Sequence, residues 1–187
     1  HYVCSLGEVL AAMIPRGVGD PKPLRKRKAT SSTAKMWPGL LMAESSLEPR
    51  VLESAQDEAL QRITAALDAH RHEVFLLYGV TGSGKTEIYL RAAERAVTDG
   101  VVLMLVPEIA LTPQIILRFE ARFGQAVGVW HSRLSLGRRV ETWEGLQSGR
   151  YQVLIGTRSA ALLPIPKASL IMLDEEHEPS YRQEDRP

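Results

Sequence analysis

The residues best suited to chemistry form a glycine-rich loop near the middle of the chain. Residues 79–86 read Gly-Val-Thr-Gly-Ser-Gly-Lys-Thr, which fits the pattern G-x-x-x-x-G-K-T. Glycines let such a loop turn tightly enough to aim several backbone N–H groups at a phosphate, and a helix that follows adds its positive N-terminal end. The lysine then reaches the β and γ phosphates, and the threonine hydroxyl holds Mg²⁺. The sequence therefore predicts an ATP·Mg²⁺ site formed by Gly79, Thr81, Gly82, Ser83, Gly84, Lys85 and Thr86.

Two adjacent carboxylates supply the other half of such a site. Asp174 and Glu175 directly follow the apolar run Leu-Ile-Met-Leu at residues 170–173. An aspartate at the end of a buried strand can hold the metal through water, and the next glutamate can polarise the attacking water. A P-loop kinase would instead activate the hydroxyl of its acceptor, so the Asp-Glu pair favours an ATPase. We expect Lys85, Asp174 and Glu175 to be catalytic, and Thr86 and Asp174 to hold Mg²⁺.

Alternating strands and helices must position these groups. From residue 51 onward, short apolar runs alternate with segments of helical periodicity. The pattern predicts strands at 74–78, 101–106, 127–130, 153–155 and 170–173, and helices at 55–69, 86–97, 111–123 and 138–146. Continuously apolar strands are buried on both faces, as in a parallel sheet that is covered on both sides. The predicted fold class is therefore α/β, a RecA-like P-loop lobe with helices on both faces of a parallel sheet.

Composition limits the partners and the compartment. The 187 residues carry 23 Lys+Arg and 22 Asp+Glu, so any nucleic-acid surface must be a local patch. Cys4 is the single cysteine, which excludes an internal disulfide and a cysteine-based zinc site within the sequence. No apolar run approaches the roughly 20 residues of a membrane helix, and the start lacks a signal-peptide pattern. We expect a cytoplasmic protein without membrane contact.

The chain divides into three segments. Residues 19–50 are rich in Pro, Lys, Arg, Ser and Thr, with five basic residues between Lys22 and Lys28. This composition is typical of a solvated linker, although a basic arm that follows a phosphate backbone is the alternative. Residues 51–187 form the predicted lobe, and residues 1–18 hold a short amphipathic stretch before the linker.

Several sequence blocks resemble superfamily 2 DNA helicases, and more closely the bacterial replication-restart helicases. The first is the loop itself, extended through Glu87, Ile88 and Tyr89. The others, in chain order, are residues 106–114 (VPEIALTPQ), His131-Ser132, residues 155–160 (IGTRSA), residues 174–177 (DEEH) and residues 180–184 (SYRQE). Residues 1–18 also resemble the close of that family's N-terminal DNA-binding domain.

The resemblance implies roles for individual residues. Loops after three strands would contact single-stranded DNA through Pro107, Thr112, Gln114, Thr157, Arg158, Tyr181 and Arg182. Tyr181 would stack on a base, which grips a single strand without sequence preference. His177 would relay the nucleotide state to the DNA side, and Gln56 would read adenine. Considered alone, these residues also fit ordinary turns, a solvent-facing helical glutamine and a terminal tail.

The resemblance also implies what the whole protein does and what this chain lacks. It implies a 3′-to-5′ helicase that acts on single-stranded and forked DNA in replication restart, with primosome and single-strand-binding proteins as partners. The second motor lobe and a zinc-binding insertion, expected downstream, are missing from these 187 residues, so we expect a fragment that is impaired on its own. The alternatives are a nucleotide-regulated DNA- or partner-binding module without turnover, a P-loop kinase, and a translocase of a restriction system.

Overall fold

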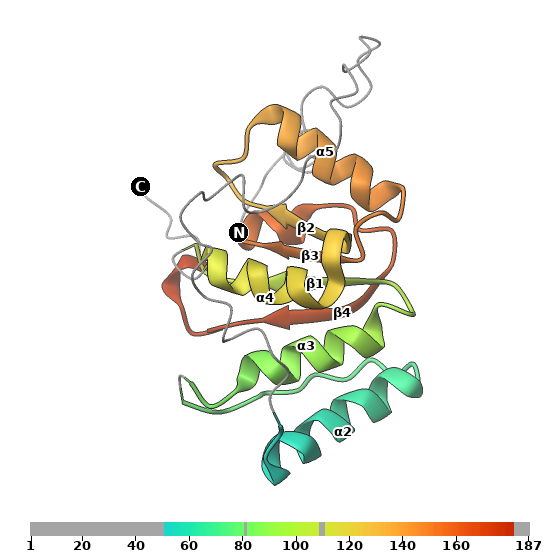
Figure 1. The fold of residues 1–187 in the computed structure, drawn as a ribbon, viewed down its shortest axis with the longest axis vertical. Helices are drawn as coiled ribbons and strands as arrows, with labels where there is room; N and C mark the ends of the chain where they lie inside the picture. The colour runs from blue at the N-terminus through green and yellow to red at the C-terminus, as the bar shows by residue number, and fades with distance from the viewer. Residues whose placement is uncertain (1–50, 81, 109–110, 182–187) are drawn as a thin grey trace, which may run out of the picture.

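The computed structural model describes residues 51–80, 82–108 and 111–181 (Figure 1). The predicted segments 1–18 and 19–50 lie outside the described residues, as do Thr81 and Arg182.

Four parallel strands form the sheet. They are β1 (Val101–Leu105), β2 (Val127–Trp130), β3 (Val153–Gly156) and β4 (Ala168–Leu173). The order in the sheet is β2-β3-β1-β4, which runs from top to bottom in Figure 1, and every pairing is parallel. Parallel neighbours need crossover connections, and helices supply them here. The predicted α/β class is confirmed.

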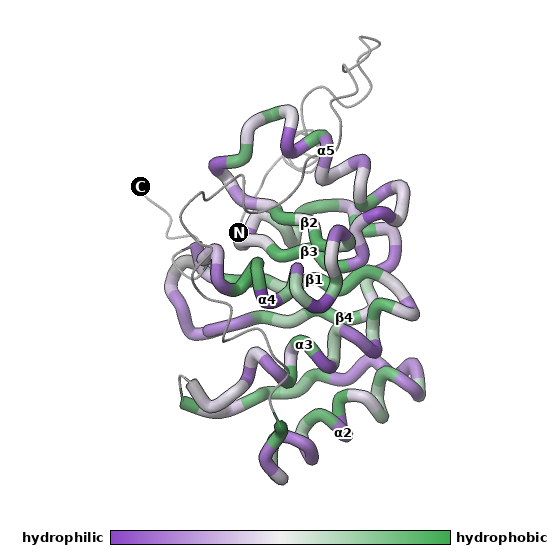
Figure 2. Tube along the Cα trace, in the orientation of Figure 1, coloured by the Kyte–Doolittle hydropathy of each residue, from purple (hydrophilic) through white to green (hydrophobic). Residues whose placement is uncertain are grey.

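Helices cover both faces of this sheet. The α-helices are α2 (Ser54–Asp68), α3 (Lys85–Ala96), α4 (Pro113–Phe123) and α5 (Leu136–Gln147). Short 3₁₀ helices are η3 (Gly124–Ala126), η4 (Arg158–Leu162) and η5 (Pro179–Tyr181). Alternate residues of β1 point to opposite faces, as the pleat requires. Val102 and Met104 pack in one buried cluster with α3 and α4, and Leu103 packs in a second cluster with α5 and η4. Figure 2 shows the hydrophobic residues concentrated along these central strands.

The sheet brings the carboxyl ends of its strands to one edge. Backbone hydrogen bonds continue past the strands and tie the loops together there. The N–H of Asp174 donates to the carbonyl of Leu105 over 2.9 Å, and the N–H of Thr157 donates to that of Trp130 over 3.1 Å. The loops that follow all four strands therefore emerge on the same side of the molecule, where ligands of open parallel sheets usually bind.

The strand predicted at 74–78 is absent from this sheet. Side chains at alternate positions face outward, with exposed fractions of 84% for Val74, 78% for Leu76 and 95% for Tyr78. The segment is extended but belongs to no described strand pairing. The continuous apolar run predicted a buried strand, but a strand also needs a backbone partner. The described residues supply none, and β4 likewise ends the sheet with Ile171 61% exposed.

Candidate nucleotide-binding site

The glycine-rich loop has the backbone that the motif requires. Gly82 and Gly84 have φ values of 83° and 82°, in the left-handed region that favours glycine. Gly84 is also the N-cap of α3. A Cβ atom there would lie 2.6 Å from the Gln56 side-chain nitrogen, which is the end of a flexible side chain that can shift, so the backbone conformation is what selects glycine. The loop thus delivers the N-terminus of α3, with its unpaired N–H groups, to the strand-end edge of the sheet.

Lys85 closes this loop from inside. Its Nζ donates to the carbonyl oxygens of Gly79 at 2.6 Å and Val80 at 3.0 Å. An ammonium has three donors, so two of them hold the loop in the shape of a cradle. A phosphate in the cradle would meet this cation and the positive end of the twelve-residue α3. The residues present therefore fit the triphosphate of a nucleotide.

Gln56 connects the loop to α2. Its Nε2 donates to the carbonyl of Ser83 at 2.7 Å, and its Oε1 accepts from the N–H of Glu53 at 2.8 Å. Glu53 is the N-cap of α2 and forms a capping box with Gln56. The amide of Gln56 is largely engaged by these contacts. Its reading of adenine stays a prediction.

Asp174 lies opposite the first turns of α3, at the end of β4. Its Oδ1 accepts a hydrogen bond from the hydroxyl of Tyr89 at 3.3 Å, and its backbone carbonyl accepts one from the hydroxyl of Tyr181 at 2.9 Å. Burial, and then the charge of Asp174, raise the pKa of both tyrosines, so their hydroxyls remain donors. Sequence reasoning missed Tyr89, although its position three residues after Thr86 places it on the same helix face.

Glu175 has an unusual backbone. Its φ is 47°, one of two left-handed non-glycine residues in the described part of the chain. Such a conformation costs about 1–3 kcal/mol and recurs at functional sites. The N–H of Glu178 donates to the carbonyl of Glu175, which holds the turn. The half-buried side chain follows directly on Asp174, where a water-activating carboxylate is needed.

Mg²⁺ fits the donors available at this place. The ion prefers one or two protein oxygens together with phosphate oxygens and waters, and Thr86 and Asp174 would supply those protein oxygens. The described residues contain no group of three or more His, Cys, Asp or Glu side chains that could hold a metal ion.

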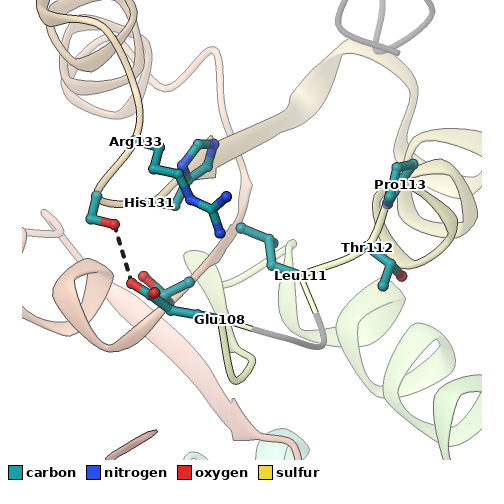
Figure 3. Close-up of a pocket in the computed structure, with 8 residues that line it drawn as sticks. Glu108, Leu111, Thr112, Pro113, His131 and Arg133 are labelled. Atoms are coloured by element: carbon teal, nitrogen blue, oxygen red, sulfur yellow. Dashed lines mark hydrogen bonds between the residues drawn. The ribbon is translucent and has the colours of Figure 1, made fainter.

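A second hollow lies at the same edge, beyond β1, β2 and β3. It is a cavity of about 270 Å³ lined by Glu108, Leu111, Thr112, Pro113, His131, Ser132, Arg133 and Thr157. Figure 3 shows His131 and Arg133 across this space from Thr112 and Pro113, at the start of α4. The Ser132 hydroxyl donates to Glu108 at 3.1 Å. Burial, then the charge of Arg133, lowers the pKa of His131, so this imidazole is neutral at neutral pH.

The structure brings some of the predicted DNA-contacting residues to this cavity but not others. Thr112 and Thr157 line it, and Thr157 is only 3% exposed. Gln114 and Arg158 are exposed nearby, at the starts of α4 and η4. Pro107 is fully buried, and its contact with DNA stays a prediction.

Tyr181 lies in η5, in the loop after Asp174. The Tyr181 ring packs against the second core cluster while its hydroxyl binds Asp174, so here it braces the end of β4. His177 is exposed, and Arg182 lies outside the described residues. Base stacking by Tyr181 and the relay by His177 stay predictions.

Comparison with known proteins identifies the family. The sequence profile of the DEAD/DEAH box helicases matches residues 53–186. The chain is similar to the replication restart protein PriA of Bacillus subtilis, with 46% identity over 141 residues, 75% of this chain and 18% of the relative. It is similar to that of Treponema pallidum, with 40% identity over 182 residues, 97% of this chain and 25% of the relative.

These relatives confirm the resemblance to replication-restart helicases that the motifs predicted. The chain spans only 18% to 25% of the length of these two relatives. No helix in the described part of the chain has the length and apolar character that a membrane crossing needs. The match over residues 53–186 covers most of the chain, which therefore belongs to the DEAD/DEAH box helicase family.

Proposed function

We propose that this chain is the ATP-binding lobe of an ATP-dependent 3′-to-5′ DNA helicase that acts in replication restart. One observation carries the proposal: the P-loop at the start of α3 and the Asp174–Glu175 pair at the end of β4 lie together. The hydrogen bond between Tyr89 and Asp174 joins these two elements directly. The family match and the names of the relatives support the same function.

The residues divide the work of hydrolysis. Lys85 would turn its ammonium from the loop carbonyls to the β and γ phosphates, and the N-terminal N–H groups of α3 would bind the same oxygens. Thr86 and Asp174 would hold Mg²⁺, which neutralises phosphate charge when it is bound. Glu175 would orient the attacking water and accept its proton. Gln56 would keep the loop in place through its contact with Ser83.

The cavity at the ends of β1 to β3 supports a second role, in contacting single-stranded or forked DNA. Thr112 and Thr157 offer hydroxyls there, the N-terminus of α4 adds positive potential, and Arg133 adds a cation. Gln114 and Arg158 extend this surface, and such groups suit the phosphates of a DNA backbone. Tyr181 and Arg182 would extend it further, and His177 would link it to the nucleotide.

The cellular setting follows from the relatives, which are named replication restart proteins. We propose that the whole protein works in the cytoplasm on stalled forks, with primosome and single-strand-binding proteins as partners. Zinc would belong to a part of the whole protein beyond residues 51–187.

Phosphate release by the full-length protein tests this function. Wild type should release phosphate from ATP faster when a single-stranded oligonucleotide is added, and Lys85→Ala should abolish turnover because the phosphates lose the loop's cation. Lys167→Ala, which removes an exposed lysine just before β4, is the matched control and should behave as wild type. Turnover in Lys85→Ala equal to wild type would refute the site. Nucleotide binding without any turnover in wild type would favour a regulated binding module.

A further inference from the structure

Tyr89 is the part of the nucleotide site for which the function above gives no role. It lies three residues after Thr86 on α3, so both side chains are on the same face of the helix. Its ring is partly buried and packs against the first core cluster, while its hydroxyl extends to the Oδ1 atom of Asp174 at 3.3 Å. The same helix face thus carries the hydroxyl of Thr86, proposed to bind the metal, and, about one turn later, the hydroxyl of Tyr89, which contacts Asp174.

The backbone of Asp174 is fixed independently of its side chain. Its N–H donates to Leu105, and its carbonyl accepts from Tyr181. The carboxylate itself can still rotate about its side-chain bonds. Among the described residues, Tyr89 is the partner that restrains it. The restraint occupies Oδ1 and leaves Oδ2 for a water in the shell of a metal.

The contact is long for an O–H···O hydrogen bond, whose usual length is near 2.7–2.8 Å. Charge-assisted O–H···O⁻ bonds are shorter still, about 2.5–2.7 Å, so this contact is a weak one of its kind. The contact therefore orients the carboxylate without competing strongly for its charge. It also joins α3 to β4 across 85 positions of sequence.

We propose that Tyr89 is a positioning residue for Mg²⁺. Its hydroxyl would hold the carboxylate of Asp174 in the orientation in which Asp174 and Thr86 together can bind the ion. The proposal rests on the proposed ATP·Mg²⁺ site and adds a residue to it. Its consequence is a defined coupling, in which Tyr89 affects the part of nucleotide affinity that depends on Mg²⁺ and leaves the rest unchanged.

Tyr89→Phe is the sharpest test, because it keeps the ring in the core and removes only the hydroxyl. Isothermal titration of the 187-residue chain with ATP would be run in excess Mg²⁺ and again in EDTA. The affinity gained through Mg²⁺ should fall roughly 3- to 10-fold in Tyr89→Phe, as expected for the loss of one hydrogen bond of ordinary strength. ATP affinity in EDTA should stay as in wild type, since the P-loop is untouched.

Matched variants separate the possible outcomes. Tyr151→Phe makes the same chemical change in the core cluster on the opposite face of the sheet, and it should leave both affinities unchanged. If Tyr89→Phe lost ATP affinity equally with and without Mg²⁺, the role of Tyr89 would be purely structural. If Mg²⁺ raised the ATP affinity of Tyr89→Phe as much as that of wild type, Tyr89 would have no role in metal binding. Either result overturns the proposal. Binding by wild type that Lys85→Ala does not weaken would instead overturn the proposed nucleotide site.

Discussion

At the scale of single residues, Glu175 is where the backbone departs most from ordinary geometry in the catalytic pair. Its left-handed φ of 47° follows an aspartate whose own backbone is fixed on both sides by Leu105 and Tyr181. These neighbouring contacts therefore hold the strained backbone of Glu175 in place. Such an arrangement suits a side chain that must meet a water beside the γ phosphate.

Replacing Glu175 should separate binding from hydrolysis. Glu175→Gln keeps the size and polarity of the side chain but removes the base, so ATP affinity should stay close to wild type while turnover by the full-length protein is lost. Asp174→Ala should instead weaken ATP binding, specifically the part of the affinity that depends on Mg²⁺. Titration calorimetry and phosphate release on the same preparations would check both. Full hydrolysis by Glu175→Gln would show that another group activates the water.

At the scale of elements, a buried ion-pair network joins α3 to α4. Glu87 is 8% exposed and accepts hydrogen bonds from Arg91 at 2.9 Å and Arg122 at 2.8 Å. Arg122 also contacts the more exposed Glu94 at 3.0 Å. Burial by itself would raise the pKa of Glu87, but the hydrogen bonds and charges of Arg91 and Arg122 together lower it.

This network predicts a pH-dependent stability. Because the folded-state pKa of Glu87 is below its ordinary value, its contribution is complete above that value and disappears as the pH falls through the folded-state pKa. Glu87→Gln should lower the free energy of unfolding by about 1–3 kcal/mol at pH 7. The difference in the free energy of unfolding between wild type and Glu87→Gln should disappear in acid. Urea unfolding at neutral and acidic pH would measure this.

Glu94→Gln is the matched control for that measurement. It removes a carboxylate that shares Arg122 but is far more exposed, with 45% of its side chain accessible to solvent. Its cost should not exceed about 1 kcal/mol, as for surface pairs. If the difference in unfolding free energy between wild type and Glu87→Gln were equally large in acid, the ion pairs of Glu87 could not be its cause.

The same scale shows what sequence patterns can predict. Continuous apolar runs placed β2 at its observed bounds and located β1, β3 and β4, because buried parallel strands leave that signature. The pattern at 74–78 predicted a strand that no described neighbour pairs with, since pairing is not local information. The burial of Pro107 and the contact between Tyr89 and Asp174 could not be predicted for a related reason, because both depend on packing across the sheet.

At the scale of the whole molecule, one edge of the sheet carries both the nucleotide site and the proposed DNA surface. The loops after β1 and β4 are tied at Leu105 and Asp174, so the two sites share a framework. Phosphoryl transfer in such motors also needs an arginine from a facing lobe, worth roughly 10³–10⁵ in rate. We propose that the loops of Arg158 and Arg182 contact DNA, so neither residue is a natural candidate for that role.

The 187-residue chain alone should therefore bind ATP but hydrolyse it very slowly, with little stimulation by single-stranded DNA. It should not unwind duplexes, since translocation requires lobes that open and close around the nucleotide. Its DNA binding should be weak and should fall with added salt. Steady-state phosphate release with and without single-stranded DNA would show this, with Lys85→Ala as the blank. Robust DNA-stimulated turnover by this chain would mean that its catalytic set is already complete.

The central claim is that the loop at 79–86 and the Asp174–Glu175 pair form one ATP·Mg²⁺ site within this chain. The most direct measurement is isothermal titration of ATP·Mg²⁺ into wild type and into Lys85→Ala. We predict saturable binding of one nucleotide by wild type and none detectable for Lys85→Ala, because the phosphates lose the cation that lies in their cradle. Equal affinity of the two proteins for ATP·Mg²⁺ would contradict the account.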